Sequence, residues 1–161
     1  MTNRLFSTSD DWTLAVVRAT LGVVMFAHGA QKMLGWFGGY GFNGTMNYFT
    51  GQMGIPALFA FLAIAAEFFG ALGLIVGLLT RIAAFGIACL MAVAIAMVHS
   101  QVGFFMNWNG AQKGEGFEYH LLVLAITLTL MVRGAGAWSI DRLISGRAAS
   151  AGSHDHLPVH A

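Results

Sequence analysis

Charged side chains are scarce in this chain. Of its 161 residues, 8 are Lys or Arg and 7 are Asp or Glu, so charged residues make up 9% of the sequence. A soluble domain carries about 25%. Hydrophobic residues make up 57%, and the mean hydropathy is +0.70. So few charges cannot cover a surface that faces water, and we therefore predict a single domain that has lipid as part of its solvent.

Basic runs and cysteine pairs are also missing. The formal net charge is +1, with no basic run to neutralise phosphates, which argues against nucleic-acid binding. The single cysteine, Cys89, excludes an internal disulfide and a CxxC redox pair. A haem-ligating pair and a Rossmann glycine pattern are absent too. The sequence contains no electron carrier of its own, so it predicts at most a subunit of an oxidoreductase, and enzymatic activity stays open.

Four apolar segments have the length of a membrane span, near the 20 or so residues that a bilayer core requires. The segments run from Trp12 to Met33, Ile55 to Leu79, Ile82 to His99 and Tyr119 to Trp138. Their hydrophobicity alternates too little for barrel strands. We predict an all-α integral membrane four-helix bundle over residues 12–142. Residues 1–11 form a cytoplasmic N-terminus without a cleavable signal pattern, and residues 143–161 a disordered tail.

The basic residues divide unevenly between the connecting segments. With both termini in the cytoplasm, the positive charges inside outnumber those outside, as the positive-inside rule requires. The inner residues are Arg4, Arg81, Arg142 and Arg147, and the outer ones are Lys32 and Lys113. We therefore predict a multi-pass protein of the bacterial inner membrane with both termini cytoplasmic.

Polar side chains from three helices then meet near the outer surface. They are His28, Gln31, Lys32, His99, Glu118 and His120. We predict that they line a substrate or quinone pocket. Glu118 and His120 are about 200° apart around a helix, and of the two we expect Glu118 to face the pocket. Two plainer interpretations stay open: the histidines reach water at helix ends, and Gln31 and Lys32 are ordinary interface residues.

Arg18 and Glu67 lie deep in apolar segments. Counted from the outer boundary at 1.5 Å per residue, their depths are about 22 and 18 Å. An unpaired charge near mid-membrane costs at least about 2.5–3.5 kcal/mol. We therefore predict a mid-membrane Arg18–Glu67 ion pair that forms the pocket floor, or that only fixes the helix register.

Two aromatic, glycine-rich loops follow the first and third segments: "GWFGGYGFNGTMNYFTGQMG" and "GFFMNWNGAQKGEGFEY". Aromatic rings suit the headgroup region. We predict that the first loop caps the pocket, with Trp36 and Tyr40 as its lid, and a quinone headgroup would fit such surroundings. Simple interfacial anchoring is the alternative.

Four stretches resemble the DoxX family of small four-helix membrane proteins. They are "VVRATLGVVMFAHGAQKMLGWFGGYG", "AEFFGALGLIVGLLTRIAA", "MAVAIAMVHSQVGFF" and "EGFEYHLLVLAITLTLMVRGAGAWSID". The resemblance covers about residues 12 to 142. It implies the four-helix fold and a similarity to the membrane subunits of thiosulfate:quinone oxidoreductases. It also implies a link to membrane-bound oxidoreductase complexes that handle thiols and oxidative stress.

The leading hypothesis is the membrane subunit of a quinone-linked oxidoreductase, with a quinone held non-covalently and no metal. His154, His156 and His160 near the C-terminus are too weak a pattern to predict a metal site. A small-molecule or proton carrier, or a scaffold that anchors soluble proteins, is the alternative. The expected partners are the lipid bilayer and other oxidoreductase subunits. A homo-oligomer also stays open.

Overall fold

The fold is all-helical in the part of the chain that the structure describes. The structure is a computed structural model that describes the backbone of residues 5–152 and the side chains of residues 5–146. Five helices are long: α2 (Trp12–Leu34), α4 (Ala57–Val76), α5 (Thr80–Met97), α6 (Glu118–Arg133) and α7 (Ile140–Gly152). The short elements between them are η1 (Trp36–Gly38), α3 (Gly41–Asn47), η2 (Tyr48–Gln52) and η3 (His99–Gln101).

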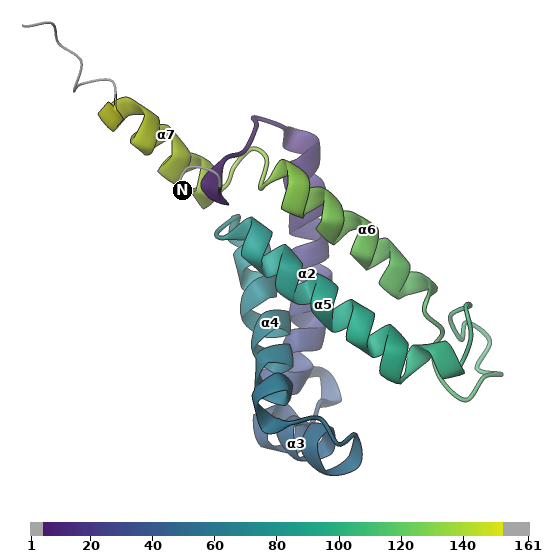
Figure 1. Cartoon of the computed structure of the whole chain (residues 1–161). Helices are drawn as coiled ribbons and strands as arrows, with labels where there is room; N and C mark the ends of the chain where they lie inside the picture. The colour runs from purple at the N-terminus through teal and green to yellow at the C-terminus, as the bar shows by residue number, and fades with distance from the viewer. Residues whose placement is uncertain (1–4, 153–161) are drawn as a thin grey trace, which may run out of the picture.

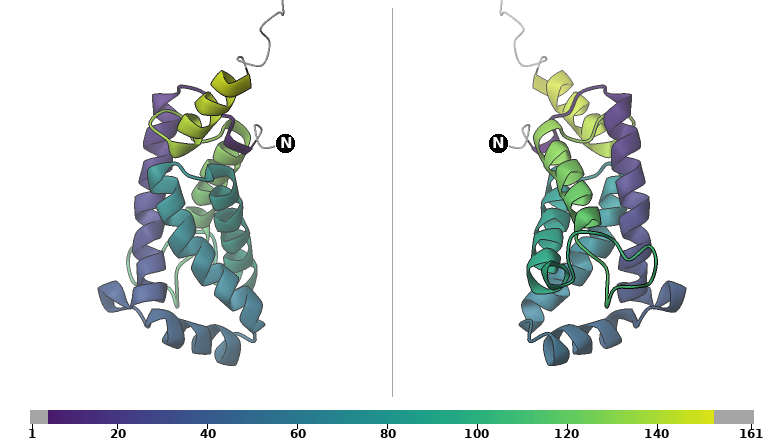
Figure 2. Two further views of the ribbon diagram at one scale, coloured as in Figure 1. Left: turned by 90° about the vertical axis from the view of Figure 1, so that its left-hand side faces the viewer. Right: turned by 90° about the vertical axis from the view of Figure 1, so that its right-hand side faces the viewer.

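Four helices form the bundle, as two antiparallel pairs. α2 packs on α4, α5 packs on α6, and the pairs meet through α4 and α5 and, less extensively, through α2 and α6. Figure 1 shows the pairs converging at the end where α7 begins and diverging toward α3. The side views in Figure 2 place α3 across the far end of α2 and α4. We call this far end, with residues 35–56 and 98–117, the loop end.

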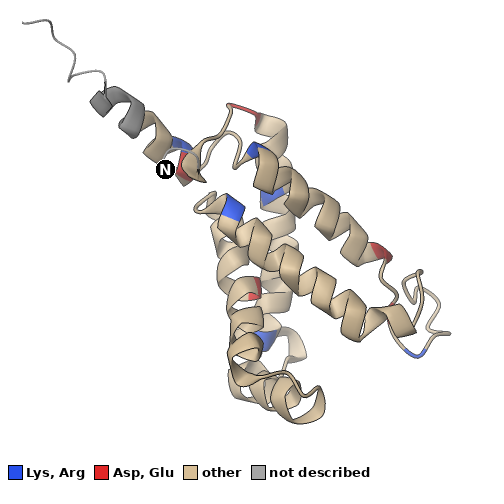
Figure 3. Ribbon diagram, in the orientation of Figure 1, with Lys and Arg blue, Asp and Glu red and all other residues tan. Residues whose placement is uncertain are grey.

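The opposite end holds the turns at 77–79 and 134–139, and we call it the arginine end. Figure 3 shows most of the basic positions gathered there. An apolar core separates the two ends. Its buried members are Leu21, Met25, Ala71, Leu74, Ala84, Ile87, Met91, Val123 and Leu130.

The predicted membrane fold is confirmed, with one shorter helix. α2, α4 and α5 are long and apolar enough to cross a bilayer. α6 has 16 residues, about 24 Å at 1.5 Å per residue, and stops well before the predicted end at Trp138. Gly134 and Gly136 have φ values of 86° and 77°, outside the helical region, so they turn the chain toward α7.

Glycines on α2 set its register against α4. A Cβ on Gly29 would lie 2.7 Å from the Phe68 Cα, and one on Gly22 would lie 2.9 Å from the Ile75 backbone nitrogen. Close approach through small residues is typical of helices packed in lipid. The register places Glu67 level with Gly29, and Arg18 is about 16 Å away along α2 at 1.5 Å per residue.

α7 contradicts the prediction of a disordered segment from residue 143. The helix continues to Gly152, because "RAAS" is rich in alanine, the best helix former. The Ser139 hydroxyl also accepts a hydrogen bond from the Arg142 backbone N–H at 3.3 Å, as a helix cap does. Residues 153–161, including His154, His156 and His160, lie outside the described residues.

Candidate functional site

Arg18 binds backbone carbonyls at the arginine end. Its Nε donates to the Ala135 carbonyl at 2.9 Å, and its Nη2 donates to that of Trp138 at 3.2 Å. Its Nη1 donates to the carbonyls of Leu74 and Ile75. The side chain is 2% exposed. Arg18 thus ties the last turn of α4 to the turn that follows α6.

Asp141 carries the opposite charge that interacts with Arg18, and it was not among the predicted site residues. Asp141 is 2% exposed, and its negative charge attracts the Arg18 guanidinium. Its carboxylate accepts the backbone N–H groups of Leu79 at 2.7 Å and Thr80 at 2.9 Å, at the start of α5. A carboxylate at a helix N-terminus is stabilising. The "SID" at residues 139–141 is a helix-start sequence that could have identified it.

Glu67 pairs with Lys32, so the predicted Arg18–Glu67 ion pair is wrong. The Lys32 Nζ lies 2.8 Å from Glu67 Oε1, and the two side chains are 28% and 4% exposed. The prediction assumed that α2 and α4 end level at the outer boundary. In fact α4 extends beyond α2 at the loop end, so Glu67 comes level with Gly29 and reaches the lysine one turn further along.

A row of aromatic and titratable side chains leads from the α2–α4 pair to the loop surface. The ring centroids of His28 and Tyr119 are 6.3 Å apart, those of Tyr119 and His120 5.6 Å, and those of His120 and His99 4.0 Å. The His99 Nδ1 lies 2.8 Å from the Glu115 carbonyl, at an exposed position. The structure thus brings His28, His120 and His99 together, with Tyr119 between the first two.

Glu67 lies at the inner end of this row, and we call the six residues from Lys32 and Glu67 through His28, Tyr119 and His120 to His99 the loop-end cluster. The Glu67 carboxylate interacts electrostatically with both His28 and Tyr119. The Tyr119 hydroxyl donates to the Met25 sulfur at 3.7 Å. Tyr119 was not among the predicted site residues, although it lies between two of them in the sequence.

Two polar atoms of the loop-end cluster are buried without a hydrogen-bond partner: Glu67 Oε2 and His120 Nδ1. His120 is 7% exposed and Glu67 3%. A buried polar group without a partner costs about 1–3 kcal/mol. The cluster is therefore suited to a ligand that brings polar atoms of its own.

Glu118 faces the loop, which corrects the expectation that it faces the pocket. It accepts a hydrogen bond from the Met106 N–H at 2.8 Å and from Trp108 Nε1 at 3.4 Å. His120 faces the interior on the same stripe as Val123 and Thr127. The α6 positions one and two turns after Glu118 are exposed. Glu118 organises residues 103–117 because α6 begins only at Glu118, where its carboxylate still reaches loop N–H groups.

The remaining predicted residues lie at the edge of the loop-end cluster. Gln31 donates from Nε2 to the Phe37 carbonyl at 3.4 Å, which supports η1. Trp36 is 52% exposed and meets the edge of Phe26, with centroids 6.3 Å apart, and Tyr40 is 80% exposed. Neither ring is buried against the cluster, so neither forms a closed lid over it.

The described residues hold no group of three His, Cys, Asp or Glu side chains that could bind a metal ion. Two hollows lie elsewhere, at the arginine end. One, of about 630 Å³, adjoins α7, and one, of about 350 Å³, runs between α2 and α6. The predicted pocket residues line neither of them.

Comparison with known proteins agrees with the resemblance in the sequence. The DoxX family matches residues 13–100, more than half of the chain. The chain is 34% identical over 136 residues to "Inner membrane protein YqjF" of Escherichia coli (strain K12), which covers 84% of this chain and 95% of that protein. It is 30% identical over 115 residues to "Putative oxidoreductase CatD" of Bacillus subtilis (strain 168), covering 71% and 75%. No solved structure matches significantly. The extent of these matches and the helical membrane fold agree: the chain belongs to the DoxX family.

Proposed function

We propose that this chain is the membrane subunit of a quinone-linked oxidoreductase of the bacterial inner membrane, and that the loop-end cluster binds the quinone headgroup. The observation that carries the proposal is the pair of buried, unpartnered polar atoms, Glu67 Oε2 and His120 Nδ1. A quinone headgroup is flat and carries two polar oxygens. A quinone oxygen would accept a hydrogen bond from a protonated His120 Nδ1, and a hydroxyl of the reduced quinol would donate one to Glu67 Oε2.

The side chains of the loop-end cluster are suited to proton exchange with that ligand. A bound quinone supplies two-electron chemistry, and each two-electron reduction takes up two protons. An imidazole can donate a proton from one ring nitrogen and accept one at the other, so the adjacent rings of His120 and His99 offer a proton route from the buried cluster to the loop surface. The contact of His99 with the exposed Glu115 carbonyl provides the end of that route at the loop surface.

Electrons must reach the quinone through a partner protein, because the sequence shows no electron carrier. The similar protein CatD is named "Putative oxidoreductase", and YqjF is named "Inner membrane protein". Both names support the proposal for this chain. A carrier or proton path would use the same row of side chains without a quinone, and a scaffold would not need the row.

Organic extraction of the purified protein and titration with a short-chain quinone such as decylubiquinone test the proposal. We expect co-purified quinone, and a loss of affinity of about tenfold, or 1.4 kcal/mol, in His120→Ala and Glu67→Gln. Lys113→Gln, an exposed loop change, is the matched control. Full quinone affinity in both variants would contradict the proposed site. Proton flux through proteoliposomes without any quinone would favour the carrier instead.

A further inference from the structure

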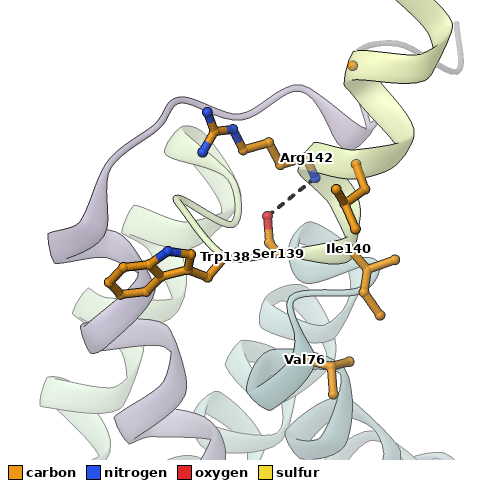
Figure 4. A pocket seen from close by; sticks show the side chains of 7 residues that line it. Val76, Trp138, Ser139, Ile140 and Arg142 are labelled. Carbon is orange, nitrogen blue, oxygen red and sulfur yellow. Dashed lines mark hydrogen bonds between the residues drawn. The ribbon is translucent and has the colours of Figure 1, made fainter.

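A second surface feature lies at the arginine end, in the hollow of about 630 Å³ between the end of α4 and the start of α7 (Figure 4). Its lining includes Val76, Trp138, Ser139, Ile140, Arg142 and Leu143. Val76 is the last residue of a helix that is long and apolar enough to span the bilayer. The hollow is therefore level with the boundary between hydrocarbon and headgroups, where each exposed surface meets phospholipid.

The lining is mostly apolar and strongly exposed. Trp138 is 77% exposed, Leu143 64% and Val76 45%. Tryptophan is enriched at membrane interfaces, because the indole is apolar and carries one polar N–H. Helices with apolar and basic side chains commonly lie in that layer. An acyl chain thus matches the hollow better than water does.

Hydrogen bonds fix the backbone beside the hollow. Trp138 has a φ of 48°, in the left-handed region that a bulky residue rarely adopts. Its carbonyl accepts a hydrogen bond from the buried Arg18, which fixes the turn and directs the indole away from the core. Ser139 donates to the Gly136 carbonyl at 2.9 Å and accepts from the Arg142 N–H. The start of α7 is thus fixed beside the hollow.

One cation borders this apolar surface. The Arg142 side chain is 44% exposed, and its Nη1 contacts the carboxylate of Asp10, which is 64% exposed. A guanidinium has five donor hydrogens, so this contact leaves others for a phosphate. A pair this exposed is also weak.

We infer that this hollow binds an anionic phospholipid of the surrounding bilayer. The acyl chain packs against Trp138, Leu143 and Val76, and the headgroup phosphate binds Arg142. The inference is independent of the proposed quinone function, because the loop-end cluster lies at the opposite end of the bundle.

Native mass spectrometry of the full chain tests the inference, with equal amounts of dioleoyl phosphatidylglycerol and dioleoyl phosphatidylcholine in the detergent. We expect phosphatidylglycerol adducts to exceed phosphatidylcholine adducts about fivefold, the preference that one interfacial basic residue provides. Arg142→Gln should abolish the preference, and Asp10→Asn should increase it by removing the competing carboxylate. Lys113→Gln removes one positive charge at the loop end and should leave the preference unchanged. Equal binding of both lipids, or an unchanged preference in Arg142→Gln, would overturn the inference.

Quenching by tail-brominated phosphatidylglycerol locates the lipid. The brominated lipid quenches part of the tryptophan fluorescence. The quenched amount should decrease more in Trp138→Phe than in Trp108→Phe, which replaces an exposed loop indole. If Arg142→Gln does not fold, Arg142→Lys is used in its place. This variant keeps the positive charge, so it should retain the preference for phosphatidylglycerol. Equal quenching losses in the two tryptophan variants would place the lipid elsewhere and refute the site.

Discussion

The Lys32 ammonium lies 2.8 Å from the Glu67 carboxylate, whereas Arg18 binds four backbone carbonyls at the other end of the bundle. The two systems differ in kind. Arg18 is fully buried and holds turns together, while Lys32 is partly exposed and leaves one oxygen of Glu67 unpaired. An apolar core separates the two systems, and the proposed quinone site includes only the Lys32–Glu67 pair.

The first prediction concerns this pair. Lys32→Gln should destabilise the protein in detergent by about 2–4 kcal/mol, because it leaves a buried carboxylate without its counter-charge. Lys113→Gln should have little effect, since Lys113 is exposed. Thermal unfolding followed by circular dichroism measures both.

A double-mutant cycle then separates the observed pair from the one that the sequence predicted. Glu67→Gln should restore much of the stability lost in Lys32→Gln, because the buried charge is then gone. Arg18→Gln and Glu67→Gln should be additive, since their partners differ. Strong coupling between Arg18 and Glu67, with none between Lys32 and Glu67, would contradict the structure.

The second prediction concerns Gly77, in the turn between α4 and α5. Its φ is 69°, and a Cβ there would lie 2.4 Å from the Ser139 Cβ and 3.0 Å from the Arg18 Cζ. Gly77→Ala should therefore lower the yield of folded protein severalfold, since both the backbone and the arginine must shift. Gly51→Ala, where a Cβ meets nothing within 4 Å, is the control. Size-exclusion chromatography after membrane extraction measures the yield.

Hydrophobic patterning was enough to predict the four bundle helices, because span length and composition depend on sequence alone. The partner of Glu67 could not be predicted in this way. It depends on how far α4 extends beyond α2, which the contact of Gly29 with Phe68 decides. Likewise, a 200° separation showed that Glu118 and His120 face different ways, but only the position of the loop after α5 decides which one faces the interior.

The third prediction concerns Glu118 as an organiser of the loop. Glu118→Ala removes the acceptor for the Met106 N–H and Trp108 Nε1, so hydrogen exchange in residues 103–117 should increase. The stability of the bundle should change little, because the carboxylate contacts the loop and not the core. Glu118→Gln keeps an acceptor oxygen and should restore part of the protection. Unchanged exchange in the alanine variant would show that other contacts, such as the Phe117 N–H to the Gly103 carbonyl, hold the loop alone.

The fourth prediction is the orientation in the membrane, with the arginine end in the cytoplasm and the loop end outside. The basic residues favour it, since Arg18, Arg81, Arg133 and Arg142 all belong to the arginine end and positive charge is retained inside. With Cys89 replaced by Ala, Asn43→Cys should react with an impermeant maleimide in intact cells, because Asn43 is exposed on α3. Gly152→Cys, at the end of α7, should react only after permeabilisation. The opposite labelling pattern would place the loop-end cluster on the cytoplasmic side. Protons for the proposed quinone site would then be exchanged with the cytoplasm, because His99 lies at the loop surface, in contact with the Glu115 carbonyl, in either orientation.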